Sequence, residues 1–64
     1  MNRADCENWI INIESCMEHI TRELGYETVR HILSKYGARS VEELHPNQFS
    51  EIFSELYAIE ADLK

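Results

Sequence analysis

Apolar residues in the second half of the chain recur at intervals of three and four, in two runs separated by turn-forming residues. The first run is Val29, Ile32, Leu33 and Tyr36, and the second is Phe49, Ile52, Phe53, Leu56, Ile59 and Leu63. Such spacing places each run on one face of an α-helix. Gly37 can end the first helix, and Pro46 suits the first turn of the next because its missing N–H is not needed there. The pattern predicts helices over about 26–36 and 46–62.

Between these helices, Ser40-Val41-Glu42-Glu43 has the sequence of a capping box. In that motif the Ser hydroxyl accepts a hydrogen bond from the third backbone N–H, and the Glu carboxylate accepts one from the Ser N–H. The segment predicts a short helical turn over about 40–44.

A longer amphipathic segment precedes Gly25 and predicts a first helix over about 4–24. Its apolar positions form two overlapping seams, 6-9-13-16-20 and 10-13-17-20-24. Together they make a stripe wider than contact with one neighbouring helix requires. Such a helix contacts either two neighbours inside its own domain, or one inside and one outside. We expect Gly25 to end the helix in a left-handed conformation. A single kinked helix through Gly25 is the alternative, because glycine costs only about 1 kcal/mol within a helix.

These elements predict a single all-α domain over residues 1–64, a small three-helix bundle whose short connections make neighbouring helices roughly antiparallel. The chain has 64 residues, and a domain of that size buries only roughly 60% of its unfolded surface. Contact with a partner chain is one way to stabilise so small a fold.

The chain carries a formal net charge of −6, from 12 acidic and 6 basic residues. Four of the basic residues form a candidate nucleic-acid patch in the middle of the chain: Arg22, Arg30, Lys35 and Arg39. The flanking segments are acidic, whereas affinity for the phosphate backbone comes from cations, so a basic protein surface is a better match. Binding of DNA through this patch, or acidic mimicry of nucleic acid, is the alternative function.

Residues that could carry chemistry match no catalytic or metal-binding pattern. Cys6 and Cys16 lie ten residues apart in the first helix, about 15 Å along its axis, which is too far for a disulfide. The sequence contains no zinc-type ligand pairing, phosphate-binding glycine loop or nucleophile motif. We therefore expect no enzymatic activity, no metal and no cofactor.

Nothing in the sequence predicts membrane insertion or secretion. No apolar run approaches the roughly 20 residues that a membrane helix needs. Asp5 stands where a signal peptide would begin its apolar core. We expect a cytoplasmic protein.

The wide apolar stripe of the first helix indicates protein–protein contact. Trp, Tyr and Met are frequent at binding interfaces, and residues of these types lie near the ends of the predicted bundle. The predicted interface consists of Trp9, Ile10, Ile13, Met17 and Tyr57. We predict a non-enzymatic helical interaction module that forms a homodimer through its first helix, or docks there on another protein.

One further observation concerns the segment over residues 32–44, which reads Ile-Leu-Ser-Lys-Tyr-Gly-Ala-Arg-Ser-Val-Glu-Glu-Leu and is followed by Pro46 and Phe49–Leu56. These residues, about half of the chain, resemble a group of small uncharacterised proteins associated with conjugative and other mobile elements of gut Firmicutes. The resemblance implies a bacterial cytosolic protein. It brings no activity and no functional residue with it.

Overall fold

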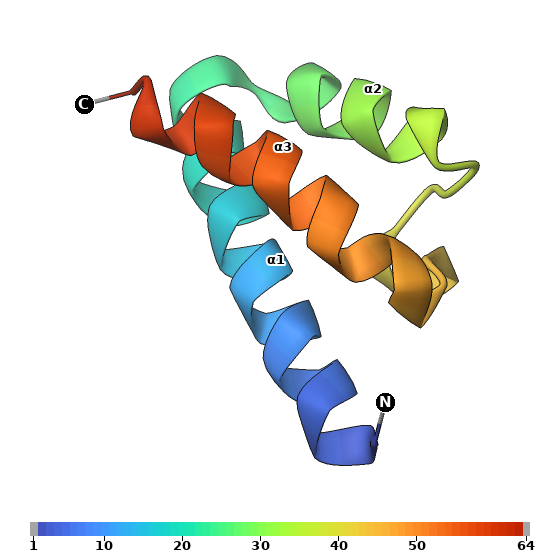
Figure 1. Ribbon diagram of the computed structural model, residues 1–64. Coiled ribbons are helices and arrows are strands. Elements are labelled where there is room, and N and C mark those ends of the chain that lie inside the picture. The colour runs from blue at the N-terminus through green and yellow to red at the C-terminus, as the bar shows by residue number, and fades with distance from the viewer. Residues whose placement is uncertain (1, 64) are drawn as a thin grey trace.

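Three α-helices joined by short turns make up the computed structural model, which describes residues 2–63. They are α1 (Arg3–Leu24), α2 (Tyr26–Lys35) and α3 (Phe49–Ala61), with the 3₁₀ turns η1 (Val41–Glu43) and η2 (Pro46–Gln48) between the last two. α1 and α3 run in the same general direction, and α2 runs back against them (Figure 1). The predicted all-α three-helix bundle is confirmed.

The break between α1 and α2 lies at Gly25, as predicted, but its conformation differs from the prediction. The Gly25 N–H donates to the Thr21 carbonyl at 2.9 Å and closes the last turn of α1. Gly25 then has φ +91° and ψ 163°, which is extended backbone of the mirror-image hand rather than a left-handed helical turn. Essentially only glycine adopts this region, so one residue is enough to redirect the chain into α2.

The end of α2 is a Schellman motif centred on Gly37, which has φ +73°. The Ala38 N–H donates to the Leu33 carbonyl at 3.1 Å, and the Gly37 N–H donates to the Ser34 carbonyl at 3.0 Å. These two bonds satisfy carbonyls that the end of a helix would otherwise leave free. The predicted stop at Gly37 is confirmed.

The helical turn predicted over about 40–44 forms as η1, but the predicted capping box does not. The Ser40 side chain makes no cap hydrogen bond. The Glu43 carboxylate instead accepts from the Arg39 N–H at 2.7 Å, one residue before the predicted partner. Glu43 still stabilises the start of η1, but the hydrogen bond comes from the Arg39 N–H instead of the Ser40 N–H.

The last helix begins later than predicted. Pro46 opens the 3₁₀ turn η2, and the α-helix starts at Phe49. Gln48 supports this entry, because its Oε1 accepts from the His45 N–H at 2.9 Å. The 3₁₀ turn η2 therefore comes directly before α3 and sets the direction in which α3 leaves the loop.

One core joins all three helices and the loop. Its buried apolar residues are Ile13, Cys16 and Ile20 of α1, Val29, Ile32 and Leu33 of α2, Phe49, Ile52 and Leu56 of α3, and Ala38, Val41 and Leu44 between helices. α1 contacts α2, α3 and η1. Apart from the exposed Leu24, both seams of α1 therefore contact neighbours inside the domain, which is the first of the two alternatives that the sequence left open. Between residues 2 and 63 no helix has the length and apolar character to cross a bilayer.

Candidate functional site

The predicted interface residues do not share one environment. Ile13 is wrong as an interface residue: its exposed fraction is 0% because it lies at the centre of the core. Ile10, Met17 and Trp9 are half-buried and pack against the core. Tyr57 remains 54% exposed. Of the five, Trp9 and Tyr57 are brought to one surface.

Trp9 and Tyr57 are connected by Phe53 into a row of aromatic rings across α1 and α3. The ring centroids of Trp9 and Phe53 are 5.8 Å apart at an interplanar angle of 74°, an edge-to-face contact. The centroids of Phe53 and Tyr57 are also 5.8 Å apart, at 39°. Such contacts contribute about 0.5–1.5 kcal/mol beyond the area they bury. The row therefore holds α1 against α3 while part of it faces solvent.

The row is flanked by exposed residues that carry no charge. Spacings of four and three place two stripes on the side of α1 and α3 that points away from α2, namely Asn8, Asn12 and Ser15 of α1 and Ser50, Ser54 and Ala61 of α3. We call these six residues, together with Trp9, Phe53 and Tyr57, the uncharged strip. Helical spacing places Asp5 and Glu23 on the same side of α1, toward its two ends.

Glu60 lies between α1 and α3 at one end of the uncharged strip and bonds two residues of α1. Its Oε2 is 3.1 Å from His19 Nδ1, and its Oε1 is 3.7 Å from Cys16 Sγ. Burial, together with the charge and hydrogen bond of the adjacent Glu60 carboxylate, raises the pKa of the Cys16 thiol to about 11. A nucleophilic cysteine requires the opposite, a lowered pKa beside a base. The carboxylate stands between thiol and imidazole, so the cluster ties α1 to α3 rather than activating sulfur.

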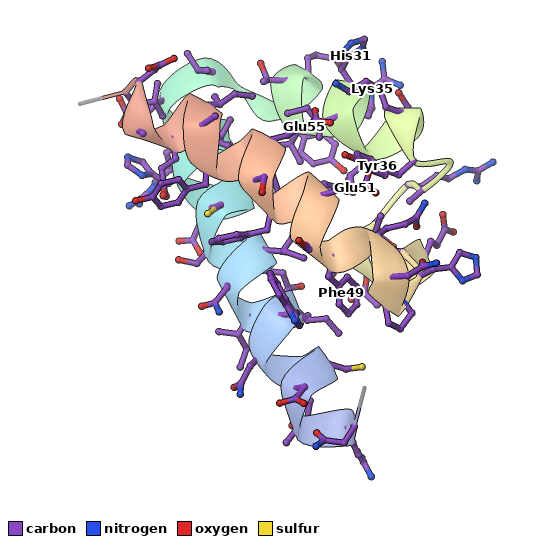
Figure 2. The ribbon with its side chains drawn as sticks, in the orientation of Figure 1. His31, Lys35, Tyr36, Phe49, Glu51 and Glu55 are labelled. Carbon is purple, nitrogen blue, oxygen red and sulfur yellow. The ribbon has the colours of Figure 1, made fainter. Side chains whose placement is uncertain are left out.

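A second polar cluster, which we call the Glu55 clasp, joins α2 to α3 (Figure 2). The Glu55 carboxylate accepts from the Tyr36 hydroxyl at 2.7 Å and lies 2.6 Å from Lys35 Nζ. The bonds from Lys35 and Tyr36 lower the pKa of Glu55. The same hydrogen bond, with burial, raises the pKa of Tyr36 to about 12. Sequence reasoning missed this clasp because Glu55 lies 19 positions from Tyr36 and 20 from Lys35.

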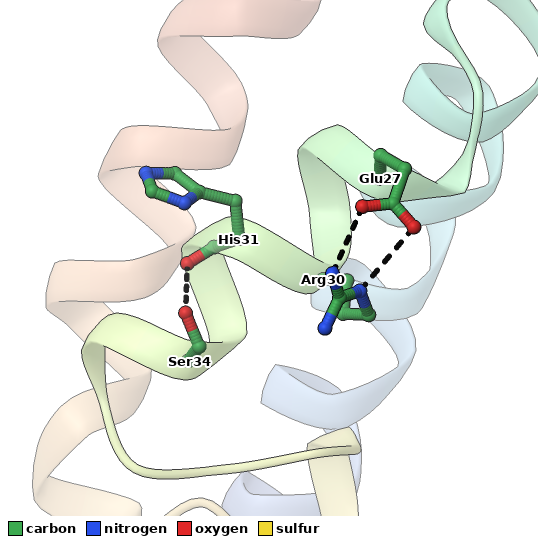
Figure 3. A network of polar contacts seen from close by, with 4 residues as sticks. All are labelled: Glu27, Arg30, His31 and Ser34. Carbon is green, nitrogen blue, oxygen red and sulfur yellow. Dashed lines mark hydrogen bonds and ion pairs between the residues drawn. The ribbon is translucent and has the colours of Figure 1, made fainter.

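The four cations of the predicted nucleic-acid patch are not gathered on one surface. Arg30 bonds Glu27 through Nη2 at 3.0 Å and Nε at 3.4 Å (Figure 3). Lys35 belongs to the Glu55 clasp, and five residues of helix turn it about 140° away from Arg30. Arg22 precedes α2 and Arg39 follows it, so roughly 15 Å of helix separates them. Binding of nucleic acid through these residues stays a prediction, and the structure weakens its support.

Enclosed pockets and metal-ligand clusters are absent from residues 2–63. This part of the chain encloses no pocket, and it contains no group of three or more His, Cys, Asp or Glu side chains arranged to hold a metal ion. Cys6 and Cys16 are both free thiols.

Comparison of the chain with known proteins found no matching family model, no matching curated protein and no matching solved structure. The resemblance to proteins of bacterial mobile elements stays a prediction.

Proposed function

We propose that this protein is a non-enzymatic helical interaction module that binds another protein chain through the uncharged strip. The observation that carries the proposal is the aromatic row, whose Tyr57 stays 54% exposed while its rings join the two longest helices. Aromatic residues are enriched at protein interfaces, and charged residues are depleted at their centres. The strip combines both properties on one side of the molecule.

The proposal keeps the predicted class of function and moves the contact surface. Sequence reasoning rested on surplus apolar surface of the first helix, but Ile13 is buried and Ile10 and Met17 pack on the core. Of the exposed large apolar side chains, Tyr57 lies in the uncharged strip, whereas Ile11, Leu24 and Tyr26 lie outside it. Self-association is one form of the proposed activity.

We also propose that the protein is cytoplasmic. Two features support its being non-enzymatic and cytoplasmic. The Cys16 thiol has its pKa raised to about 11 by burial and by Glu60, which disfavours the nucleophilic thiolate. Cys6 and Cys16 are unpaired thiols, which suits the reducing interior of a cell. Association with a bacterial mobile element is the setting that the sequence resemblance suggests.

A site-specific photo-crosslinker tests the proposed surface in the cells that make the protein. The crosslinker replaces Asn12, an exposed residue of the strip, and in a control it replaces Glu18, an exposed residue on another side of α1. We expect covalent products from the Asn12 variant and at least tenfold less from the Glu18 variant. Equal yields from both positions, or no product from Asn12, would contradict the proposal.

A further inference from the structure

We infer that α2 is a hinged flap, which opens as a unit while α1, η1 and α3 stay packed on one another. Three observations carry the inference: the glycines at both ends of α2, the few contacts that hold α2 in place, and the contacts that join the rest of the fold without it. The inference goes beyond the proposed function, because α2 lies outside the uncharged strip.

Glycines with a positive φ connect α2 to the rest of the chain at both ends. Gly25 directly precedes the helix with φ +91°, and Gly37 lies two residues after its last residue with φ +73°. A Cβ at either position would have no neighbour within 4 Å, so there is open space on that side of the backbone. Because glycine is the least restricted residue, the chain can turn at both points and α2 can move as one piece.

One apolar face and one polar cluster hold α2 in place. Val29, Ile32 and Leu33 are buried in the core, and the Glu55 clasp bonds Lys35 and the adjoining Tyr36 to α3. The bond between Glu27 and Arg30, and that from the Ser34 hydroxyl to the His31 carbonyl, stay within α2 (Figure 3). Among residues 2–63, no side-chain hydrogen bond or ion pair joins α2 to α1. The clasp is therefore the polar lock of the flap.

The rest of the fold is held together without α2. α1 packs more extensively on α3 than α2 does, and η1 also contacts α1. The aromatic row and the bond between His19 and Glu60 both bridge α1 and α3. Val41 and Leu44 are buried, so the loop that follows α2 has its own anchor in the core. These contacts stay in place when α2 leaves.

Once detached, α2 loses its helical structure. It has 10 residues, and isolated helices shorter than about 12–15 residues are marginal in water. Opening therefore exposes the backbone amides of α2 together, as in the cooperative local unfolding of a contiguous segment. It also uncovers apolar surface of α1 and α3 on the side opposite the uncharged strip. The flap thus controls solvent access to the core.

Hydrogen exchange of the full chain under native conditions, followed at single residues by NMR, tests the inference. The comparison uses hydrogen-bonded amides in the interior of each helix: residues 30–35 of α2, 13–20 of α1 and 53–59 of α3. We expect protection factors in α2 to be at least tenfold lower than those in α1 and α3. Equal protection in the three helices would overturn the inference, because it would mean that α2 opens only when the whole chain unfolds.

Two variants distinguish opening of the flap from global unfolding. Phe53→Leu removes the edge-to-face contact with Trp9, which stays intact when α2 opens. It should speed exchange several-fold in α1 and α3 and leave exchange in α2 unchanged. Tyr36→Phe removes a bond of the clasp and should speed exchange in α2 about fivefold, the factor that corresponds to one hydrogen bond.

Tyr26→Phe is the matched control for the clasp variant, because Tyr26 is an exposed residue of α2 outside the clasp. It should leave exchange in all three helices unchanged. Equal acceleration of α1, α2 and α3 in Phe53→Leu would overturn the inference. So would unchanged exchange of α2 in Tyr36→Phe. Neither outcome bears on binding through the uncharged strip, which the Asn12 crosslinker tests separately.

Discussion

Ile11 and Ile13 show how strongly helical register decides the role of a single residue. They have the same side chain and lie two positions apart on α1, yet Ile11 is 62% exposed and Ile13 is 0% exposed. The difference arises because two residues turn a helix by about 200°. Only Ile13 faces the core that α1 shares with α2 and α3.

We predict that Ile13→Ala lowers the free energy of unfolding by about 2–5 kcal/mol, because it removes buried methyl groups and leaves a cavity. The control Ile11→Ala should change it by less than about 0.5 kcal/mol, as expected of an exposed position. Urea unfolding followed by circular dichroism measures both. Similar losses for the two variants would contradict the burial described for α1.

The Glu55 clasp predicts a loss of stability at both ends of the pH range. The pKa of Glu55 is lowered in the folded protein from 4.5, so its contribution is present above that value and is lost as the pH falls through the folded pKa. The pKa of Tyr36 is raised from 10.0 to about 12. Its contribution is therefore complete below pH 10 and is lost as the pH rises toward 12.

Urea unfolding as a function of pH tests this prediction. Tyr36→Phe should cost about 1 kcal/mol at neutral pH, the usual size of one hydrogen bond, and should remove the Tyr36 part of the alkaline loss. Tyr26→Phe changes an exposed tyrosine outside the clasp and should leave that loss in place. Glu55→Gln should weaken the acid dependence. An unchanged alkaline profile in Tyr36→Phe would show that the clasp does not form.

At the scale of the elements, two glycines end helices in different ways. Neither position needs a glycine for lack of room, because a Cβ at Gly25 or Gly37 would have no neighbour within 4 Å. Their backbones set the requirement. Gly37 belongs to a Schellman motif, where asparagine is tolerated. Gly25, with φ +91° and ψ 163°, lies in a region that asparagine does not favour.

We predict that Gly25→Asn destabilises the protein by about 1–3 kcal/mol, the cost of holding a side-chain-bearing residue in that region. Gly37→Asn should cost less than about 1 kcal/mol because single asparagines enter the left-handed helical region readily. Thermal unfolding of the two variants under identical conditions gives the comparison. The reverse order would show that the connection between α1 and α2 is not made as described.

The elements also show which parts of the fold the sequence can predict. Helix positions follow from apolar spacing, and the stop at Gly37 follows from local backbone chemistry. The donor to Glu43 and the late start of α3 depend on the conformation of the loop between α2 and α3. The spacing of apolar residues does not determine that conformation. Whether α1 used both seams internally depended on the position of α2. Glu60 and its contacts with Cys16 and His19 span more than 40 positions, so no local pattern could reveal them.

At the scale of the whole molecule, folding leaves one side of α1 and α3 without charged side chains over its central part. The core contacts both seams of α1 except at Leu24, which is 52% exposed, so the predicted apolar stripe is mostly internal. The candidate site is instead made by two helices that are distant in sequence. The candidate site depends on Phe53, which connects Trp9 to Tyr57, and on the absence of charged side chains around this row. Neither feature can be recognised until α1 and α3 are placed side by side.

The reactivity of Cys16 can be used to measure how often α1 separates from α3. Its thiol is buried and held protonated between α1 and α3, whereas Cys6 on the same helix is half-exposed. Thiol reagents act on the exposed thiolate, so they modify Cys6 in the folded chain and reach Cys16 when α1 and α3 separate. The rate of modification at Cys16 relative to Cys6 thus reports how often the two helices part, with no probe added to the native sequence.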